Sequence, residues 1–282
     1  MTTATTVASG FGFLEAPRWH AGRIWFSDFY SHRVLSARED GSDLRQEATV
    51  DQQPAGLGWL PDGRLLIVSM RDRKVLRREP DGTLVTHADL AGIATGNCND
   101  MVVDDQGRAY VGNFGFDLMS GGEARPAALA RVDLDGTVTE AAAGLLFPNG
   151  SVITPDRVLI VGETYGNRCT AFDLTPDGEL VNRRVWAEFA PPAGPVAPDG
   201  CCLDADGALW IADARGSRLL RVTEGGGITD EIRPDSPVFA CALGGADGRT
   251  LYACVAPDFD AGKRTAAREA RLLAFRVAVP GA

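Results

Sequence analysis

The sequence has no long run of apolar residues, although 45% of its 282 residues are hydrophobic. No stretch approaches the roughly 20 consecutive apolar residues that a membrane-spanning helix needs. The first residues have neither the basic region nor the apolar region of a secretory signal, so we expect a cytoplasmic protein. Basic residues number 28 against 38 acidic ones, which gives a net charge of -10. Because an acidic surface repels phosphates, we expect no nucleic-acid partner and no membrane partner.

Sequence motifs of several catalytic and redox classes are missing too. The six Cys include no C-x-x-C pair, and the three His are too few and too scattered for a three-histidine metal site. We therefore expect the cysteines to be buried, reduced thiols. Neither a G-x-S-x-G elbow nor an H-E-x-x-H motif occurs, which disfavours an α/β-type serine hydrolase and a zinc protease.

Turn residues are abundant, and they separate short apolar segments that repeat along the chain. A strand, a tight turn that is usually Asp-Gly and a second strand recur as APRWHAGRIWFSD, GLGWLPDGRLLIVS, DMVVDDQGRAYVGN, GSVITPDRVLIVGE, GCCLDADGALWIAD and ALGGADGRTLYACV. Further strand pairs lie between these hairpins. A period of roughly 40–50 residues with four strands per unit is typical of a β-propeller. We predict an all-β fold, a six-bladed β-propeller with four antiparallel strands per blade, as a single domain over residues 1–282. The segment around residues 5–8 would supply the outer strand that closes the ring.

Aligning the repeats on their first strands brings six residues into register. They are spaced by 40, 44, 50, 50 and 40 positions and are Glu15, Ala55, Asn99, Asn149, Asp199 and Phe239. The first strand of each propeller blade lines the central channel, so these six residues should form a ring at one rim. Four of the six, Glu15, Asn99, Asn149 and Asp199, carry side-chain oxygen atoms, and two of those four are carboxylates.

This ring predicts a metal site. Two carboxylates that converge in a channel repel each other and lose water, and a divalent cation removes both costs. Carboxylate and amide oxygens suit a hard ion, so we predict one divalent metal ion, Ca²⁺ first, with Mn²⁺, Zn²⁺, Fe²⁺ and Mg²⁺ as alternatives. Four side chains do not fill the roughly six to eight positions around Ca²⁺, which leaves room for water or substrate.

The position after each ring member is small in five of the six repeats, as close packing near the axis requires, and the exception is Asp100. Asp100 is a candidate to accept a hydrogen bond from substrate or to orient Asn99. The second strands end at the same rim. We expect the loops 114–128 and 256–270 and the segments 91–98 and 191–198 to lie at this rim as well. Rim loops usually determine the choice of substrate. The candidate substrate contacts on this rim are Asn113, Phe114, Phe116, Asp117, Glu163, Tyr165 and Arg268.

Four segments resemble the signature segments of the senescence-marker-protein/gluconolactonase family, also written SMP-30/gluconolactonase/LRE and called regucalcin-like. They are LEAPRW, NCNDMVVDDQGRAYVGN, FPNGSVITPD and PDGCCLDADGALWIAD. The resemblance implies a six-bladed propeller that holds one divalent metal and hydrolyses lactones, often sugar lactones, with ligands that match the four oxygen-bearing ring residues. Sugar-lactonase members carry an Arg where this chain has Asn97 and a Glu that would fall at Asp117. Both residues are therefore candidate substrate contacts, and the expected substrate is a sugar lactone or a related small lactone or ester.

The sequence thus predicts a metal-dependent hydrolase that opens a small lactone by activation of its carbonyl group and attack by water. Asp199 is the expected general base, while its action as a covalent nucleophile stays open, and Glu15 is mainly a ligand. The alternatives are an esterase or phosphotriesterase of the diisopropylfluorophosphatase and paraoxonase type, a strictosidine-synthase-like enzyme and a non-catalytic Ca²⁺-binding propeller. The expected partner is a small-molecule lactone or ester, and the chain would be a monomer or a small homo-oligomer.

Overall fold

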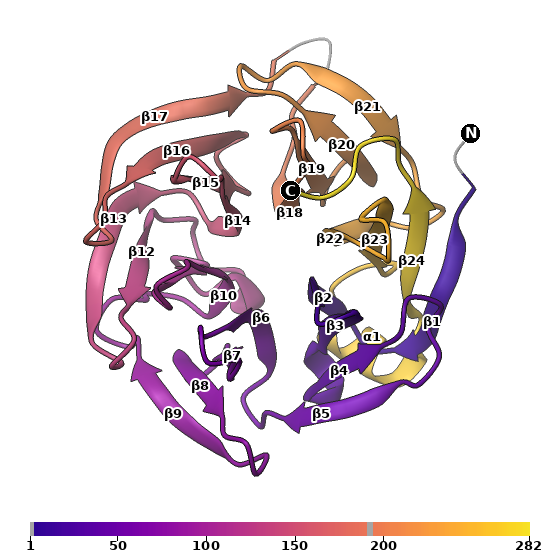
Figure 1. Ribbon diagram of the computed structural model, residues 1–282, viewed down its shortest axis with the longest axis horizontal. Coiled ribbons are helices and arrows are strands. Elements are labelled where there is room, and N and C mark those ends of the chain that lie inside the picture. Colours follow the sequence, from indigo (N-terminus) through magenta and orange to yellow (C-terminus); the bar gives the residue numbers. More distant parts are fainter. Residues whose placement is uncertain (1–2, 191–193) are drawn as a thin grey trace.

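The computed structural model describes residues 3–190 and 194–282 of the chain, which form six four-stranded sheets arranged around a central channel (Figure 1). Within each sheet, neighbouring strands are antiparallel. This arrangement confirms the predicted six-bladed β-propeller. Residues 191–193 of the rim segment 191–198 lie outside the described residues.

Each blade begins with the strand nearest the channel and continues outward. Blade 1 contains β2 (Leu14–His20), β3 (Arg23–Asp28), β4 (Arg33–Ala37) and β5 (Arg45–Thr49). Blade 2 contains β6 (Pro54–Trp59), β7 (Leu65–Ser69), β8 (Lys74–Arg78) and β9 (Leu84–Asp89). Blade 3 contains β10 (Cys98–Val103), β11 (Ala109–Asn113), β12 (Ala127–Val132) and β13 (Val138–Leu145).

The second half of the ring repeats the plan. Blade 4 contains β14 (Pro148–Ile153), β15 (Val158–Glu163), β16 (Arg168–Leu174) and β17 (Leu180–Glu188). Blade 5 contains β18 (Pro198–Leu203), β19 (Leu209–Asp213), β20 (Arg218–Val222) and β21 (Ile228–Ile232). Blade 6 contains β22 (Val238–Gly244), β23 (Thr250–Val255), β24 (Ala270–Arg276) and β1 (Thr5–Phe11).

The last blade is built from both ends of the chain. Strand β1 pairs antiparallel with β24, with Thr5 opposite Ala274 and Phe11 opposite Ala270. The prediction that the N-terminal segment supplies the outer strand is therefore confirmed. Because this one sheet contains strands from both ends of the chain, the ring cannot open without separating β1 from β24.

The Asp-Gly turns between strands form for a local reason. Asp62 and Asp135 each accept a hydrogen bond from the backbone N–H two residues on, at 3.0 and 2.9 Å. The glycines that follow, Gly63 and Gly136, have φ values of +85° and +89°, a conformation that residues with a side chain rarely adopt. These turns give the hairpins the spacing from which the repeat is recognised.

The hydrophobic core lies between neighbouring sheets. Among its largest fully buried side chains are Trp210, Tyr110, Tyr252, Phe26 and Phe275. All six cysteines are free, and all but Cys202 are buried, as predicted. Burial raises the pKa of Cys98 to about 12, so this thiol stays protonated at neutral pH.

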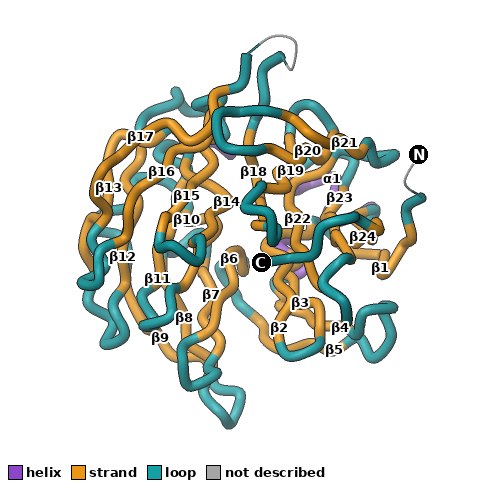
Figure 2. The backbone as a smooth tube through the Cα atoms, turned by 45° about the horizontal axis from the view of Figure 1, so that its top comes forward, coloured by secondary structure: helices purple, strands orange, loops and turns teal. Residues whose placement is uncertain are grey.

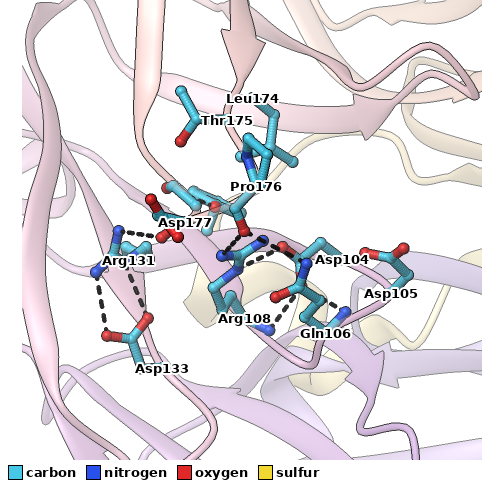
Figure 3. A network of polar contacts seen from close by, with 12 residues as sticks. Asp104, Asp105, Gln106, Arg108, Arg131, Asp133, Leu174, Thr175, Pro176 and Asp177 are labelled. Carbon is cyan, nitrogen blue, oxygen red and sulfur yellow. Dashed lines mark hydrogen bonds and ion pairs between the residues drawn. The ribbon is translucent and has the colours of Figure 1, made fainter.

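Polar contacts join neighbouring blades at the rim opposite the predicted metal ring (Figure 3). The buried Arg108, from the β10–β11 turn of blade 3, donates to Asp104 at 2.7 Å and to the Pro176 carbonyl of blade 4 at 2.8 Å. Arg131 pairs with Asp133 at 2.9 Å and reaches the Asp177 carbonyl at 3.3 Å. These contacts fix blade 3 against blade 4 and leave the other rim free for the site.

Within residues 3–190 and 194–282, helical structure is limited to η1 (Phe29–Ser31), η2 (Leu118–Ser120) and α1 (Ala261–Ala267) (Figure 2). Helix α1 lies inside the segment 256–270 that the sequence predicts as a loop. Asp260 caps this helix by accepting from the backbone N–H of Lys263 at 2.9 Å. No helix in the described ranges has the length and apolar character needed to cross a membrane.

Candidate metal and active site

The four oxygen-bearing ring residues lie where the repeat predicts them. Glu15 lies in β2, Asn99 in β10, Asn149 in β14 and Asp199 in β18, each the first strand of its blade. Their exposed fractions are only 9, 7, 3 and 7%, respectively. All four line one cavity of about 320 Å³. The propeller therefore brings together four side chains that are far apart in the sequence.

A bulge at the ring position directs these side chains into the channel. In every blade the pairing of the first two strands shifts register there, for example between Glu15 and Arg18 and between Pro148 and Ser151. The next residue must then be small. A Cβ added to Gly150 would lie 2.4 Å from the Asp199 carbonyl oxygen, and one added to Gly200 would lie 2.5 Å from the Ala240 Cβ. The expectation of close packing near the axis is confirmed.

The two ring carboxylates share one electrostatic environment. Burial raises the pKa of Glu15 well above its usual value, and the charges of Asp199 and then Asp100 raise it further. Burial also raises the pKa of Asp199, and the charge of Asp100 adds to that shift. Hydrogen bonds from the Asn149 side chain and the Gly200 backbone partly oppose it. Negative charge has thus been concentrated where water has been removed, which favours a bound cation.

Asp100, the one large residue in the position after the ring, forms an ion pair with another blade and is not among the described lining residues of the cavity. Arg18 Nη2 of β2 lies 2.6 Å from Asp100 Oδ1 of β10 and also donates to the Met101 carbonyl at 2.9 Å. Asp100 Oδ1 accepts from the backbone N–H of Met101 at 2.9 Å as well. Of the two roles predicted for Asp100, these contacts favour a supporting one next to Asn99.

A neighbouring hydroxyl fixes the amide of Asn149. Asn149 Nδ2 donates to Thr164 Oγ1 at 3.1 Å, and Thr164 Oγ1 donates to the Pro198 carbonyl at 2.7 Å. The Asn149 side chain donates to Thr164 and to Asp199, which leaves its Oδ1 atom as the potential metal ligand. The relay also connects the ring position of blade 4 to the start of β18, which carries Asp199.

The donor set fits a hard divalent cation. The described residues contain no group of three or more His, Cys, Asp or Glu side chains placed to hold a metal ion, so a metal here would depend on the two amides as well as the two carboxylates. An all-oxygen set with two negative charges matches Ca²⁺ better than a metal that prefers nitrogen or sulfur ligands.

Two predicted substrate contacts, Asn113 and Glu163, lie behind the cavity wall. Asn113 donates to the Ala128 carbonyl at 2.8 Å and accepts from the Gly115 backbone at 2.9 Å. The fully buried Glu163 accepts from the Leu146 backbone at 2.8 Å and from Arg168 Nε at 2.7 Å. Both side chains are held by their own blades, and neither belongs to the described lining of the cavity.

The remaining predicted contacts differ in where they lie. Phe114 and Tyr165 line the cavity. Asn97 is half-buried, and its carbonyl accepts from the Phe114 backbone at 2.9 Å. Asp117 is exposed and caps η2 by accepting from Ser120 at 3.1 Å. Phe116 packs edge-on against Tyr165, with ring centroids 5.6 Å apart, and Arg268 ends helix α1. The described lining of the cavity does not include Asn97, Asp117, Phe116 or Arg268.

Two further sets of equivalent positions, one from each of two places in the repeat, form much of the wall of the cavity. Neither set is predicted above as a set. Five of the six residues that lie two positions before a ring member line the cavity, and they are Phe13, Gln53, Phe147, Ala197 and Pro237. The sixth equivalent residue is Asn97. The residue after the second strand also lines it in five blades, as Phe29, Met70, Phe114, Thr164 and Ala214. The alignment that locates the ring could have located both sets.

The fold and the site together define a six-bladed propeller with a buried, oxygen-lined ring in its channel, and the relatives agree with this class. Residues 13–256 match the family described as the SMP-30/gluconolactonase/LRE-like region. The pentonolactonase XacC of Haloferax volcanii is 30% identical over 264 residues, which cover 91% of this chain and 86% of that protein.

Two solved structures share the fold. A gluconolactonase from Xanthomonas campestris superposes with a TM-score of 0.77 at 24% identity, covering 99% of this chain and 90% of the other. A regucalcin from Agrobacterium tumefaciens, described as a calcium-binding protein, gives a TM-score of 0.83 at 18% identity, covering 100% and 96%. The chain belongs to the SMP-30/gluconolactonase/LRE-like family, as its sequence segments predict.

Proposed function

We propose that this protein is a metal-dependent lactonase that opens a small lactone to its hydroxy acid. The observation that carries the proposal is the ring of Glu15, Asn99, Asn149 and Asp199, whose four buried side chains line one cavity. Relatives named as a pentonolactonase and a gluconolactonase support the class of reaction. The four ring residues are the proposed ligands of one divalent cation, with Ca²⁺ as the first candidate.

When bound, such a cation supplies Lewis-acid polarisation of the carbonyl group. The chain's own residues do the rest. Thr164 holds Asn149 with its amide oxygen available, and the Arg18–Asp100 pair fixes the strand next to Asn99. The apolar wall excludes bulk water around the lactone ring, which strengthens electrostatic interactions inside the site.

Asp199 is the proposed general base. Its carboxylate takes a proton from the attacking water as the water oxygen bonds to the carbonyl carbon. The ring C–O bond then breaks, and the same proton passes to the departing alkoxide oxygen, which completes the hydroxy acid. Glu15 serves mainly as a ligand. Phe114 is a proposed contact for the substrate, while Asn113 and Glu163 are proposed to support the wall from behind.

The test is hydrolysis of a lactone panel in a pH-indicator assay. The enzyme is stripped with a chelator and then resupplied separately with Ca²⁺, Mn²⁺, Zn²⁺, Fe²⁺ and Mg²⁺. We expect hydrolysis to be lost on stripping and restored by at least one of these metals. If the enzyme with bound metal hydrolyses no lactone, the proposal fails and the assignment moves to an ester or phosphotriester substrate or to a calcium-binding role. If the stripped enzyme keeps its full rate, the metal dependence fails.

A further inference from the structure

The cavity above the ring has an aromatic cluster on each of two opposite sides. On the side of blades 1 and 6, Phe13 packs against Phe29 and Phe239, with ring centroids 5.5 and 4.8 Å apart. On the side of blades 3 and 4, Phe147 packs against Phe114 and Tyr165, with centroids 4.6 and 5.7 Å apart. Figure 1 shows these blades facing each other across the channel. A ligand bound at the ring therefore lies between two aromatic surfaces.

Polar side chains are few in the rest of the wall. Outside the ring, those among the described lining residues are Tyr30, Gln53, Thr164, Tyr165, Arg215 and Asp258. Three of the six already have partners within the protein. The Tyr30 hydroxyl donates to the Phe259 carbonyl at 2.5 Å. Thr164 bridges Asn149 and Pro198, and Asp258 pairs with Arg264 at 3.1 Å.

A polyhydroxylated lactone fits this wall poorly. Each hydroxyl group of a sugar lactone gives up hydrogen bonds to water when it enters the cavity and must find a partner there. Arg215 lies with its guanidinium carbon 4.9 Å from the centre of the Tyr165 ring, at one side of the wall. An aromatic or alkyl group, in contrast, gains from leaving water and needs no such partner.

The mouth of the cavity is apolar too. Met119, from η2, and Phe259, just before α1, line the cavity and yet keep 49 and 52% of their surface exposed. They are two of only six large hydrophobic side chains exposed in the described part of the chain. They come from the two long rim insertions, one on blade 3 and one on blade 6. Exposed apolar side chains gathered at the entrance of a cavity mark a binding surface for an apolar group.

We infer that this enzyme prefers lactones that carry an alkyl or aryl substituent over bare and polyhydroxylated lactones, with the substituent held between the two aromatic clusters. This inference rests on the proposed lactonase function and names the class of substrate for that same site. The lactone carbonyl would face the ring, and the substituent would extend toward Met119 and Phe259.

Three lactones with the same six-membered ring test this preference. They are δ-valerolactone, which is unsubstituted, δ-decalactone, which adds a pentyl chain, and D-glucono-δ-lactone, which adds hydroxyl groups. Each kcat/KM is divided by the rate constant of the uncatalysed hydrolysis. We expect the ratio of δ-decalactone to δ-valerolactone to be about 30 or more, because each buried methylene group strengthens binding. We expect D-glucono-δ-lactone to give the lowest value.

The outcomes separate the inference from the function on which it rests. If D-glucono-δ-lactone gives the highest value, or if δ-decalactone is no better than δ-valerolactone, the inference is overturned and the lactonase function stands. If no lactone is hydrolysed, the lactonase function fails. Calorimetric binding of a pentyl-substituted cyclopentanone and of cyclopentanone then tests the apolar site directly, and equal affinities would overturn it.

A pair of variants locates the preference at the mouth of the cavity. We expect Phe259→Ser to lower the δ-decalactone to δ-valerolactone ratio by about fivefold or more, because the pentyl chain loses an apolar contact. The matched control is Leu134→Ser in the β12–β13 turn, which removes a side chain of the same 52% exposure outside the described lining of the cavity. The control should leave the ratio unchanged. Equal ratios for Phe259→Ser and the unmodified enzyme would contradict the assignment of Phe259.

Discussion

Asn149 of β14 and Thr164, which follows β15, form a hydrogen bond of 3.1 Å. Thr164 in turn donates to the carbonyl of Pro198, the residue before Asp199, at 2.7 Å. One hydroxyl thus orients an amide of blade 4 and holds the strand that carries a carboxylate of blade 5. The geometry of the proposed metal site depends on this residue, which is not itself a proposed ligand.

Replacement of this hydroxyl should weaken metal binding. We expect Thr164→Val to raise the Kd for Ca²⁺ by about 10- to 100-fold, because loss of a group that orients a ligand typically has such an effect. Thr164→Ser retains the hydroxyl and should bind within about threefold of the unmodified protein. Calorimetric titration of the stripped protein measures both. Equal affinity for the Val and Ser variants would show that the relay has no role in the site.

Removal of the proposed general base should separate turnover from metal binding. We expect Asp199→Asn to lower kcat by at least about 100-fold, because an amide cannot take the proton from water. The amide oxygen can still act as a ligand, so part of the metal affinity should remain. Asn149→Ala is the complementary variant, and it should lose metal on purification because it lacks a ligand atom. Metal content and turnover are measured on the same preparations. A near-normal rate in Asp199→Asn would exclude the assigned role.

The ring could be predicted from the sequence because a propeller repeats the same position in every blade. The spacing of Glu15, Asn99, Asn149 and Asp199 is the spacing of the repeat itself. The aromatic wall could have been predicted in the same way, because Phe13 and Phe147 lie two positions before Glu15 and Asn149.

Contacts between blades could not be predicted in this way, because the repeat does not encode which side chains meet across the channel. Arg18 and Asp100 come from blades 1 and 3, and their 2.6 Å contact depends on the closed ring. The direction of the Glu163 side chain could not be predicted from the sequence either. Because Glu163 ends a strand at the rim, the sequence predicts a contact with substrate. Its carboxylate instead accepts a hydrogen bond from the Leu146 backbone, and no pattern in the sequence marks that partner. Helix α1 is capped by Asp260, and its Arg264 pairs with Asp258 and Glu269 on either side, in a segment without helical periodicity.

Gly150 tests the close approach of blades near the axis. A Cβ at this position would lie 2.4 Å from the carbonyl oxygen of Asp199, so one of the two strands must shift. We expect Gly150→Ala to lower the free energy of unfolding by about 1–3 kcal/mol and to weaken metal binding. Gly92→Ala is the control, because nothing lies within 4 Å of its added Cβ. Denaturant unfolding compares the two variants, and equal stability would contradict the packing argument.

Glu163 tests whether a buried carboxylate supports the wall. Burial would raise its pKa, but hydrogen bonds from Arg168, Thr170 and Leu146 prevail, and the pKa is lowered. A lowered folded-state pKa adds stability above the unfolded value of about 4.3, and this stability is lost as the pH falls through the folded value. We expect Glu163→Gln to cost about 3 kcal/mol at pH 7 and less in acid.

The control for this variant is Glu140→Gln, at an exposed position of β13, which should change the free energy of unfolding by less than about 0.5 kcal/mol. Denaturant unfolding at neutral and at acid pH compares the three proteins. A cost for Glu163→Gln that does not shrink in acid would show that the charge of the carboxylate does not stabilise the fold.

The position of a bound metal ion is the decisive test of the proposed ligand ring. Crystals grown with Mn²⁺ give an anomalous diffraction signal that locates the ion independently of its ligands. We expect one strong peak in the channel, within about 2.5 Å of side-chain oxygens of Glu15, Asn99, Asn149 and Asp199. No peak at this position, or a peak whose ligands are other residues, would contradict it.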